Sequence, residues 1–390
     1  MSIQGYPSSH RFELLDILRG LSAIAVVIYH ATMQYHPLRN QVAASPETAS
    51  FSEWMIYACG SGYLGVSIFF MISGYCICAA AVNHRLKKYS IQRYFLRRMC
   101  RIYPPYWCCL GFFLLLFFFA PLHLPWLKLG TSLSLTQWLG NIFLFEEWRP
   151  YILPPDVTQY FLAVAWTLCY EEQFYFVVGV ILLLWPRGLF PLFSVVTVFV
   201  FLNNYNLNIG PLKAIGNMNA MQVDLHGLIF DSHWLFFASG IGLYCFRMTQ
   251  SAWRFAFPVF LILLLSWEFL QFDWHTNRFA TRTVTFGTSL TLCVIHTLDG
   301  KICKWIVAAP LLWLGARTYS IYLIHLPLVL VLTNAEARFG RENPLFTLLC
   351  TVPLSVVVSL VAGDVFYRLV ERRFIPTSLP GNNPACITLT

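Results

Sequence analysis

Charged side chains are scarce in this sequence of 390 residues, in which they make up 11% while hydrophobic residues make up 57%. Soluble domains carry roughly 25% charged residues, so this chain has too few to cover a soluble surface. The scarcity excludes intrinsic disorder, a nucleic-acid-binding surface and an ordinary cytosolic enzyme. It indicates an integral membrane protein, in which long apolar segments face lipid.

Several chemical signatures are also missing. The 12 cysteines include no Cys-x-x-Cys pair and no Cys/His cluster with zinc spacing, so we expect neither a disulfide framework nor a metal site. There is no Gly-x-Ser-x-Gly elbow, P-loop or dinucleotide fingerprint, which argues against a lipase-like serine and a nucleotide fold. No Asn-x-Ser/Thr glycosylation acceptor occurs, which favours a bacterial cytoplasmic membrane.

Long apolar segments recur along the whole chain, and a membrane span needs about 20 such residues. The stretch 133–147 is apolar but short, so we expect an interfacial or re-entrant helix there. The predicted fold is an all-α polytopic transmembrane bundle, with residues 1–375 as one membrane domain and 376–390 as a short flexible cytoplasmic tail. The sequence predicts ten spans, at roughly 14–35, 62–82, 104–122, 162–185, 189–204, 232–248, 255–271, 282–299, 315–333 and 345–367.

Basic residues set the predicted orientation, because Lys and Arg concentrate in cytoplasmic loops. With the loop 83–103 in the cytoplasm and ten spans, both termini are cytoplasmic, and inside segments hold about twice as many Lys and Arg as outside segments. The net charge of +8 then reflects contact with anionic lipid, not nucleic acid. The loop 83–103 contains Arg85, Lys87, Lys88, Arg93, Arg97, Arg98 and Arg101.

Two ionisable residues stand inside the first predicted span. Arg19 and His30 are eleven positions apart, which is close to three helical turns, so they share one face at roughly 16 Å along the axis. Ionisable groups inside a span are costly and are therefore functional candidates. The alternative is a buried His satisfied by a neighbour and an Arg that reaches toward the headgroups.

A pair of carboxylates, Glu171 and Glu172, begins the fourth predicted span. Adjacent helical residues point about 100° apart, so at most one of them faces a given site squarely. A neutral His with a carboxylate behind it is a common arrangement for a general base. We expect His30 to be that base and Glu171, in preference to Glu172, to support it; the alternative is two interfacial carboxylates in contact with water.

Arg98 and Arg101 lie at i and i+3 just before a Pro-Pro pair, where we expect the helix to break. Clustered Arg at a cytoplasmic mouth suits a ligand that carries phosphate. The alternative is that they follow the general excess of basic residues on the cytoplasmic side. His325 stands mid-span in the ninth segment, and a lone His in an apolar run is also compatible with a structural role.

Several motifs follow one another in order between positions 12 and 374: RFELLDILRGLSAIAVVIYH with its Arg-x10-His, GYLGVSIFFMISGY, Arg98-x-x-Arg101 followed by YPPYW, WTLCYEEQFY, LGARTYSIYLIHLP and ERRF. In these motifs the chain resembles the acyltransferase-3 family of polytopic membrane O-acyltransferases. Residue 17 is Ile where that family commonly has Gly. Its members often carry an extra span and a C-terminal SGNH domain, and we expect neither in this sequence.

The resemblance implies transfer of an acyl group, usually acetyl, from cytoplasmic acyl-CoA to a hydroxyl of a surface-glycan or lipid-linked sugar. Acyl-CoA is then a co-substrate, and no bound cofactor is expected. An acyl-His intermediate stays open, as does acyl translocation completed by a partner. A transporter or flippase is the alternative, although paired broken helices in inverted repeats are absent. The candidate residues are His30, Glu171 and Glu172 for catalysis, and Arg19, Arg98, Arg101, Tyr103 and His325 for substrate binding.

Overall fold

The structure is a computed structural model that describes residues 12–87, 89–119, 133–155, 157–204, 232–270, 277–302, 304, 308–339 and 343–375. Within these ranges the chain forms helices joined by turns and holds no strand, which confirms the predicted all-α class. The predicted tail 376–390 lies outside the described residues.

Each of the ten predicted spans coincides with a helix. Seven stretches of the described chain are long and apolar enough to cross a membrane, and they cover all or most of each of these helices except α8, α10 and α12. The latter three therefore stay predicted spans. The ten helices are α1 (Glu13–Ala31), α4 (Leu64–Leu86), α5 (Ile91–Phe119), α7 (Ala165–Leu184), α8 (Leu189–Asn204), α10 (His233–Met248), α11 (Ala256–Leu270), α12 (Asn277–Ile295), α15 (Thr318–Arg338) and α17 (Val352–Phe366).

Shorter elements complete the bundle. The π-helical segments Thr347–Thr351 and Tyr367–Glu371 flank α17 and join it to its neighbours. The helix α6 spans eight residues and is too short to cross a membrane, as predicted for this stretch. The short helices are α2 (His36–Ala44), α3 (Phe51–Gly60), α6 (Leu135–Ile142), α13 (Asp299–Ile302), α14 (Ala308–Gly315), α16 (Pro344–Phe346) and α18 (Arg372–Phe374).

The start of α5 differs from the prediction. The helix begins at Ile91 and continues through Pro104 and Pro105, so Arg98 and Arg101 lie on a helix and not in a loop before a break. Proline removes one backbone donor and disfavours a helix interior, yet tertiary packing overrides local propensity. Here Tyr106, directly after the prolines, is fully buried and donates to the carbonyl oxygen of Asn141 at 2.7 Å.

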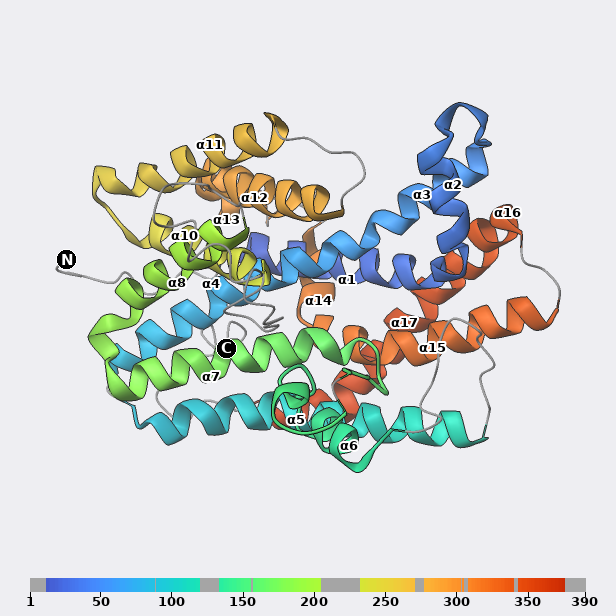
Figure 1. Ribbon diagram of the computed structural model, residues 1–390, viewed down its shortest axis with the longest axis horizontal. Coiled ribbons are helices and arrows are strands. Elements are labelled where there is room, and N and C mark those ends of the chain that lie inside the picture. Colours follow the sequence, from blue (N-terminus) through green and yellow to red (C-terminus); the bar gives the residue numbers. More distant parts are fainter. Residues whose placement is uncertain are drawn as a thin grey trace.

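The long helices run mainly along one direction of the molecule, which is horizontal in Figure 1. In this view α1 and α4 occupy the middle, α11 and α12 lie on one side, and α5 and α7 lie on the other. The helix α1 packs against α4, α14, α15 and α17, so it contacts both halves of the bundle. A side chain on α1 can therefore meet partners from the N-terminal and the C-terminal helices.

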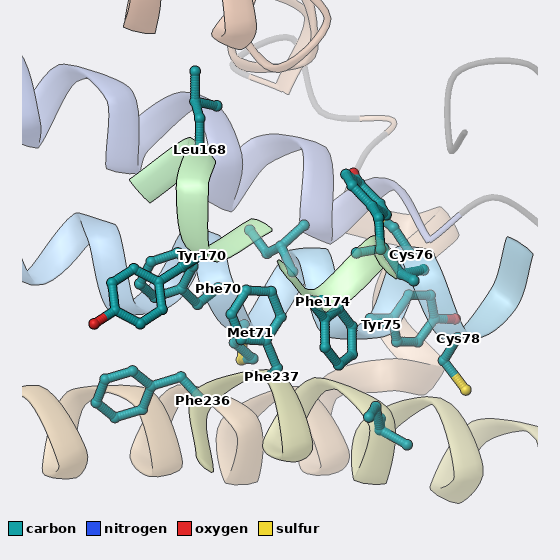
Figure 2. Packing of buried hydrophobic residues seen from close by; sticks show 14 of the residues in the cluster. Phe70, Met71, Tyr75, Cys76, Cys78, Leu168, Tyr170, Phe174, Phe236 and Phe237 are labelled. Carbon is teal, nitrogen blue, oxygen red and sulfur yellow. The ribbon is translucent and has the colours of Figure 1, made fainter. Parts of the chain in front are cut away.

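Glycines bring α4 and α10 into close contact. A Cβ atom at Gly74 would lie 2.1 Å from the carbonyl oxygen of Phe237, and one at Gly240 would lie 1.9 Å from that of Met71. Small residues allow backbones to approach in this way where lipid supplies no hydrophobic drive. Around the crossing, aromatic side chains from α4, α7 and α10 fill the core; Figure 2 shows Phe70, Phe174 and Phe237 together.

The N-terminus of α1 is capped by a residue far away in the sequence. The Asp299 carboxylate accepts hydrogen bonds from the backbone N–H groups of Leu14 at 2.9 Å and Glu13 at 3.4 Å. The residue at the N-cap position, Phe12, has no side chain able to do this. The start of α1 is therefore fixed by the segment that precedes α14.

Candidate active site

Two histidines from distant parts of the chain meet between α1 and α15. The Nε2 atom of His325 lies 3.2 Å from the Nδ1 atom of His30, and the ring centroids are 5.0 Å apart. His325 is completely buried, whereas His30 retains partial exposure. The structure thus brings together the residue predicted as the base and a residue predicted only to bind substrate.

The hydrogen-bond partners define the tautomer of each ring. The Nδ1 atom of His325 lies 2.7 Å from the Tyr322 carbonyl oxygen, which only accepts, so Nδ1 carries the hydrogen and Nε2 is an acceptor in the neutral ring. The Nδ1 atom of His30 faces two acceptors, the Val26 carbonyl oxygen at 2.9 Å and Nε2 of His325. It therefore carries a hydrogen as well, and the lone pair of His30 resides on Nε2.

The Nε2 atom of His30 makes no hydrogen bond to any side chain or backbone group in the described ranges. A neutral imidazole with an available lone pair is the form that a general base requires. His325 fixes the ring of His30 from behind by accepting its Nδ1 hydrogen. This pair can take a proton at one nitrogen and stabilise the resulting cation at the other.

The structure does not place Glu171 behind His30, where the sequence analysis predicted it. The Oε1 atom of Glu171 accepts hydrogen bonds from the Ser73 hydroxyl at 2.9 Å and the Tyr175 hydroxyl at 2.6 Å. Glu171 lines the same cavity as Arg19, which lies roughly 16 Å along α1 from His30. No hydrogen bond joins the Glu171 carboxylate to the His30 ring, and His325 occupies the supporting position.

The neighbouring Glu172 does not line this cavity. Its Oε1 atom is buried, and no hydrogen-bond partner for it occurs in the described part of the chain. The two carboxylates therefore differ, as the 100° step between adjacent helical residues predicts. The structure places neither of them against His30.

A cavity of about 140 Å³ lies between α1, α4, α5, α7 and α15. It brings together three residues that the sequence analysis selected: Arg19, Arg101 and Glu171. Sequence reasoning missed the other charged residues of its wall, Asp16 and Glu371. Glu371 is the first residue of the ERRF motif, so the sequence does contain a signal for it.

The charged side chains of the cavity differ in the number of hydrogen-bond and ion-pair partners that they have. Arg19 lies 3.8 Å from the carboxylate of Asp16 and donates to the sulfur of Cys76 at 3.4 Å. Glu371 accepts from the backbone N–H of Ser320 at 3.1 Å and from its hydroxyl at 2.5 Å. Arg101 makes no ion pair with a described residue, so its guanidinium is available to a ligand.

Two further predicted binding residues do not line the cavity. Arg98 is buried, and its guanidinium stacks 4.7 Å from the centre of the Tyr175 ring, which does line it. Arg98 therefore supports the wall from behind. Tyr103 donates to the Phe143 carbonyl oxygen at 3.0 Å and fixes α5 to the segment after α6, so its position does not support the predicted contact with substrate.

An aromatic wall separates the cavity from the histidine pair. Phe69 and Tyr322 both line the cavity and pack edge to face, with centroids 5.7 Å apart. The Tyr322 ring is also 5.7 Å from the His325 ring, and its hydroxyl lies 2.6 Å from the Thr167 hydroxyl. The arginines, the aromatic wall and the histidines thus follow one another along the bundle.

Nothing in the described ranges favours a metal centre, since no three His, Cys, Asp or Glu side chains gather there in a suitable cluster. The arrangement instead combines a cavity lined by two arginines and three carboxylates with a nitrogen base. The guanidinium of Arg101, which has no ion pair with a described residue, can bind an anionic group, and the base can remove a proton from a hydroxyl.

Comparison with known proteins adds an independent observation. The chain is 22% identical over 378 residues to the O-acetyltransferase OatA of Staphylococcus aureus, covering 92% of this chain and 56% of that protein. It is 22% identical to the peptidoglycan O-acetyltransferase OatA of Listeria monocytogenes, covering 92% of this chain and 54% of that protein. The putative peptidoglycan O-acetyltransferase YrhL of Bacillus subtilis is 21% identical, with the same coverage.

The chain spans about half the length of these curated relatives. No solved structure matches it. The sequence profile of the acyltransferase-3 family, described as an acyltransferase domain, matches residues 12–364, which is most of the chain. The helical membrane architecture and this match together lead to one conclusion: the chain belongs to the acyltransferase-3 family.

Proposed function

We propose that this protein is an O-acyltransferase of the bacterial cytoplasmic membrane. It transfers an acetyl group from cytoplasmic acyl-CoA to a hydroxyl of a cell-surface glycan, and the relatives named as peptidoglycan O-acetyltransferases support that acceptor class. The observation that carries the proposal is the His30–His325 pair, which leaves one imidazole nitrogen of His30 without a hydrogen bond to any described residue, on the far side of the Phe69–Tyr322 wall from a cavity that contains arginines.

The cavity supports acyl-CoA as the donor. CoA carries phosphates, which pair with guanidinium groups, and its pantetheine arm is long and thin. Arg19 and Arg101 line the cavity, and Arg98 stands behind its wall on the predicted cytoplasmic side. An arm that extends from these arginines past Phe69 and Tyr322 places the thioester next to His30.

The proposed reaction starts from the His30 tautomer whose lone pair is on Nε2. Nε2 of His30 takes the proton of the acceptor hydroxyl as that oxygen attacks the thioester carbonyl carbon. The tetrahedral intermediate collapses, the C–S bond breaks, and the CoA sulfur leaves with the proton that His30 had taken. During this step the Nδ1–H of His30 donates to His325, which stabilises the transient imidazolium.

The purified protein in liposomes tests the proposal. We expect labelled acetyl-CoA to yield free CoA and an acetylated glycan fragment, and we expect His30→Ala to lose about 10²–10⁴-fold in rate. Acyl-CoA binding should persist in that variant, because His30 does not line the donor cavity. A transporter or flippase would leave acetyl-CoA intact, and a folded His30→Ala protein within a few-fold of wild type would exclude this mechanism.

A further inference from the structure

A second cavity of about 1790 Å³ lies outside the candidate active site, among α8, α10 and α11. Figure 1 shows α10 between the other two helices. Its walls are aliphatic and aromatic, and they include exposed side chains such as Val198 and Phe260. An exposed apolar cleft between membrane helices is accessible to a lipid tail.

The lining of this cavity is basic. Arg85 lies in the last turn of α4, Arg187 lies in the 3-10 turn between α7 and α8, and Arg247 lies in the last turn of α10. Arg85 contacts the carbonyl oxygen of Pro186, the residue before Arg187. The residues that line the cavity include these three cations and no Asp or Glu.

The three guanidinium groups keep donors available. Arg187 is exposed and makes no ion pair with a described residue. Arg85 has one long contact, with the Pro186 carbonyl oxygen at 3.4 Å. Arg247 donates to the Tyr75 hydroxyl at 2.7 Å through one nitrogen and stacks 4.0 Å from the centre of the Phe12 ring, which leaves its other donors for a ligand.

We propose that this cavity is a binding site for an anionic phospholipid, with an acyl chain between α8 and α11 and the headgroup on Arg85, Arg187 and Arg247. Guanidinium groups bind phosphate in bidentate fashion, and basic pockets between cytoplasmic helix ends suit anionic headgroups. A zwitterionic headgroup carries its own cation, which the arginines repel because the described wall of the cavity holds no Asp or Glu. Charge therefore selects an anionic lipid.

The bound headgroup stabilises a junction that supports the active site. Arg247 joins α10 to Tyr75 on α4 and to Phe12 at the start of α1. The residue next to Tyr75, Cys76, accepts the hydrogen bond from Arg19. A lipid on Arg247 thus holds the start of α1 and the end of α10 against the middle of α4, and we expect it to raise the melting temperature of the detergent-purified protein.

Native mass spectrometry of the full chain tests the site, with phosphatidylglycerol and phosphatidylcholine of identical acyl chains offered at equal concentration. We expect one phosphatidylglycerol to be retained in preference to phosphatidylcholine. The double variant Arg85→Ala, Arg187→Ala should weaken that retention by about tenfold or more, because each charged hydrogen bond contributes substantially. Arg373→Ala is the matched control, since it removes an exposed arginine that does not line the cavity.

A second variant tests the apolar part. Val198→Trp narrows the cleft, so it should reduce retention of a long-chain phosphatidylglycerol more than that of its dioctanoyl analogue. Equal retention of both headgroups, an unchanged affinity in the double arginine variant, or displacement of the lipid by free CoA would overturn the proposal. Each of these results concerns lipid binding alone and leaves the acyltransferase proposal standing.

Discussion

At the scale of single residues, His325 determines whether His30 can act as a base. Its Nε2 atom and the Val26 carbonyl oxygen both face the Nδ1 hydrogen of His30, and together these two acceptors keep the lone pair on the opposite nitrogen. His325→Leu removes the acceptor without opening a large space. We expect acyl transfer to fall by about tenfold or more, since a hydrogen bond to a charged group contributes about 1.5–3 kcal/mol.

The conservative variant His325→Gln separates positioning from packing. Its side-chain oxygen can accept the same hydrogen, so we expect it to recover most of the activity that His325→Leu loses. The effect should appear in kcat, with KM for acyl-CoA unchanged, because His325 does not line the donor cavity. Equal activity in His325→Leu and wild type would show that the contact has no positioning role.

Arg101 and Arg98 should respond differently to removal. Arg101 lines the cavity without an ion pair to a described residue, so Arg101→Ala should lower acyl-CoA affinity by roughly tenfold with little effect on folding. Arg98 is buried against Tyr175, so Arg98→Ala should lower the melting temperature as well. Isothermal calorimetry and thermal unfolding of both variants measure the difference, and equal behaviour would contradict it.

The sequence identifies these residues as candidates but does not show which of them are in contact in the fold. Helical spacing places Arg19 and His30 on one face, and apolar surroundings mark His325 as costly to bury. Which partner reaches His30 depends on the packing of α15 against α1, and no local pattern encodes that contact. For the same reason the hydrogen-bond partners of Glu171 could not be predicted.

At the scale of helices, the crossing of α4 and α10 depends on glycine. A Cβ atom at Gly240 would lie 1.9 Å from the Met71 carbonyl oxygen, so Gly240→Ala must force the backbones apart. We expect a clear loss of thermal stability and of monodisperse protein. Gly287→Ala in α12 is the matched control, because nothing lies within 4 Å of its Cβ position. There the better helix propensity of Ala should leave stability equal or about 0.5–1 kcal/mol higher.

Apolar runs predict where helices lie but not where they begin. The start of α5 at Ile91 was missed because the basic residues before the prolines suggested a loop. Burial of Tyr106 and its hydrogen bond to Asn141 hold this helix together across Pro104 and Pro105. Helix positions thus follow from composition, whereas helix ends depend on contacts made elsewhere in the fold.

At the scale of the whole molecule, the orientation in the membrane remains a prediction, with the basic turn between α4 and α5 in the cytoplasm. A cysteine in place of Lys87, at the C-terminal end of α4, should resist a membrane-impermeant thiol reagent added to intact cells. The background would lack Cys100, Cys108 and Cys350, which are exposed in the described ranges, and also Cys303 and Cys386, which lie outside those ranges. Ready labelling from outside would reverse the topology and move the proposed donor entrance to the other face.

The cap on α1 has a consequence for the order in which the molecule is assembled. The ribosome completes α1 long before it reaches Asp299, whose carboxylate holds the first backbone N–H groups of that helix. Until then these N–H groups lack their partner, although α4 is already present to pack against α1. His325, the partner of His30, is made later still, so the reactive centre is completed late in biosynthesis.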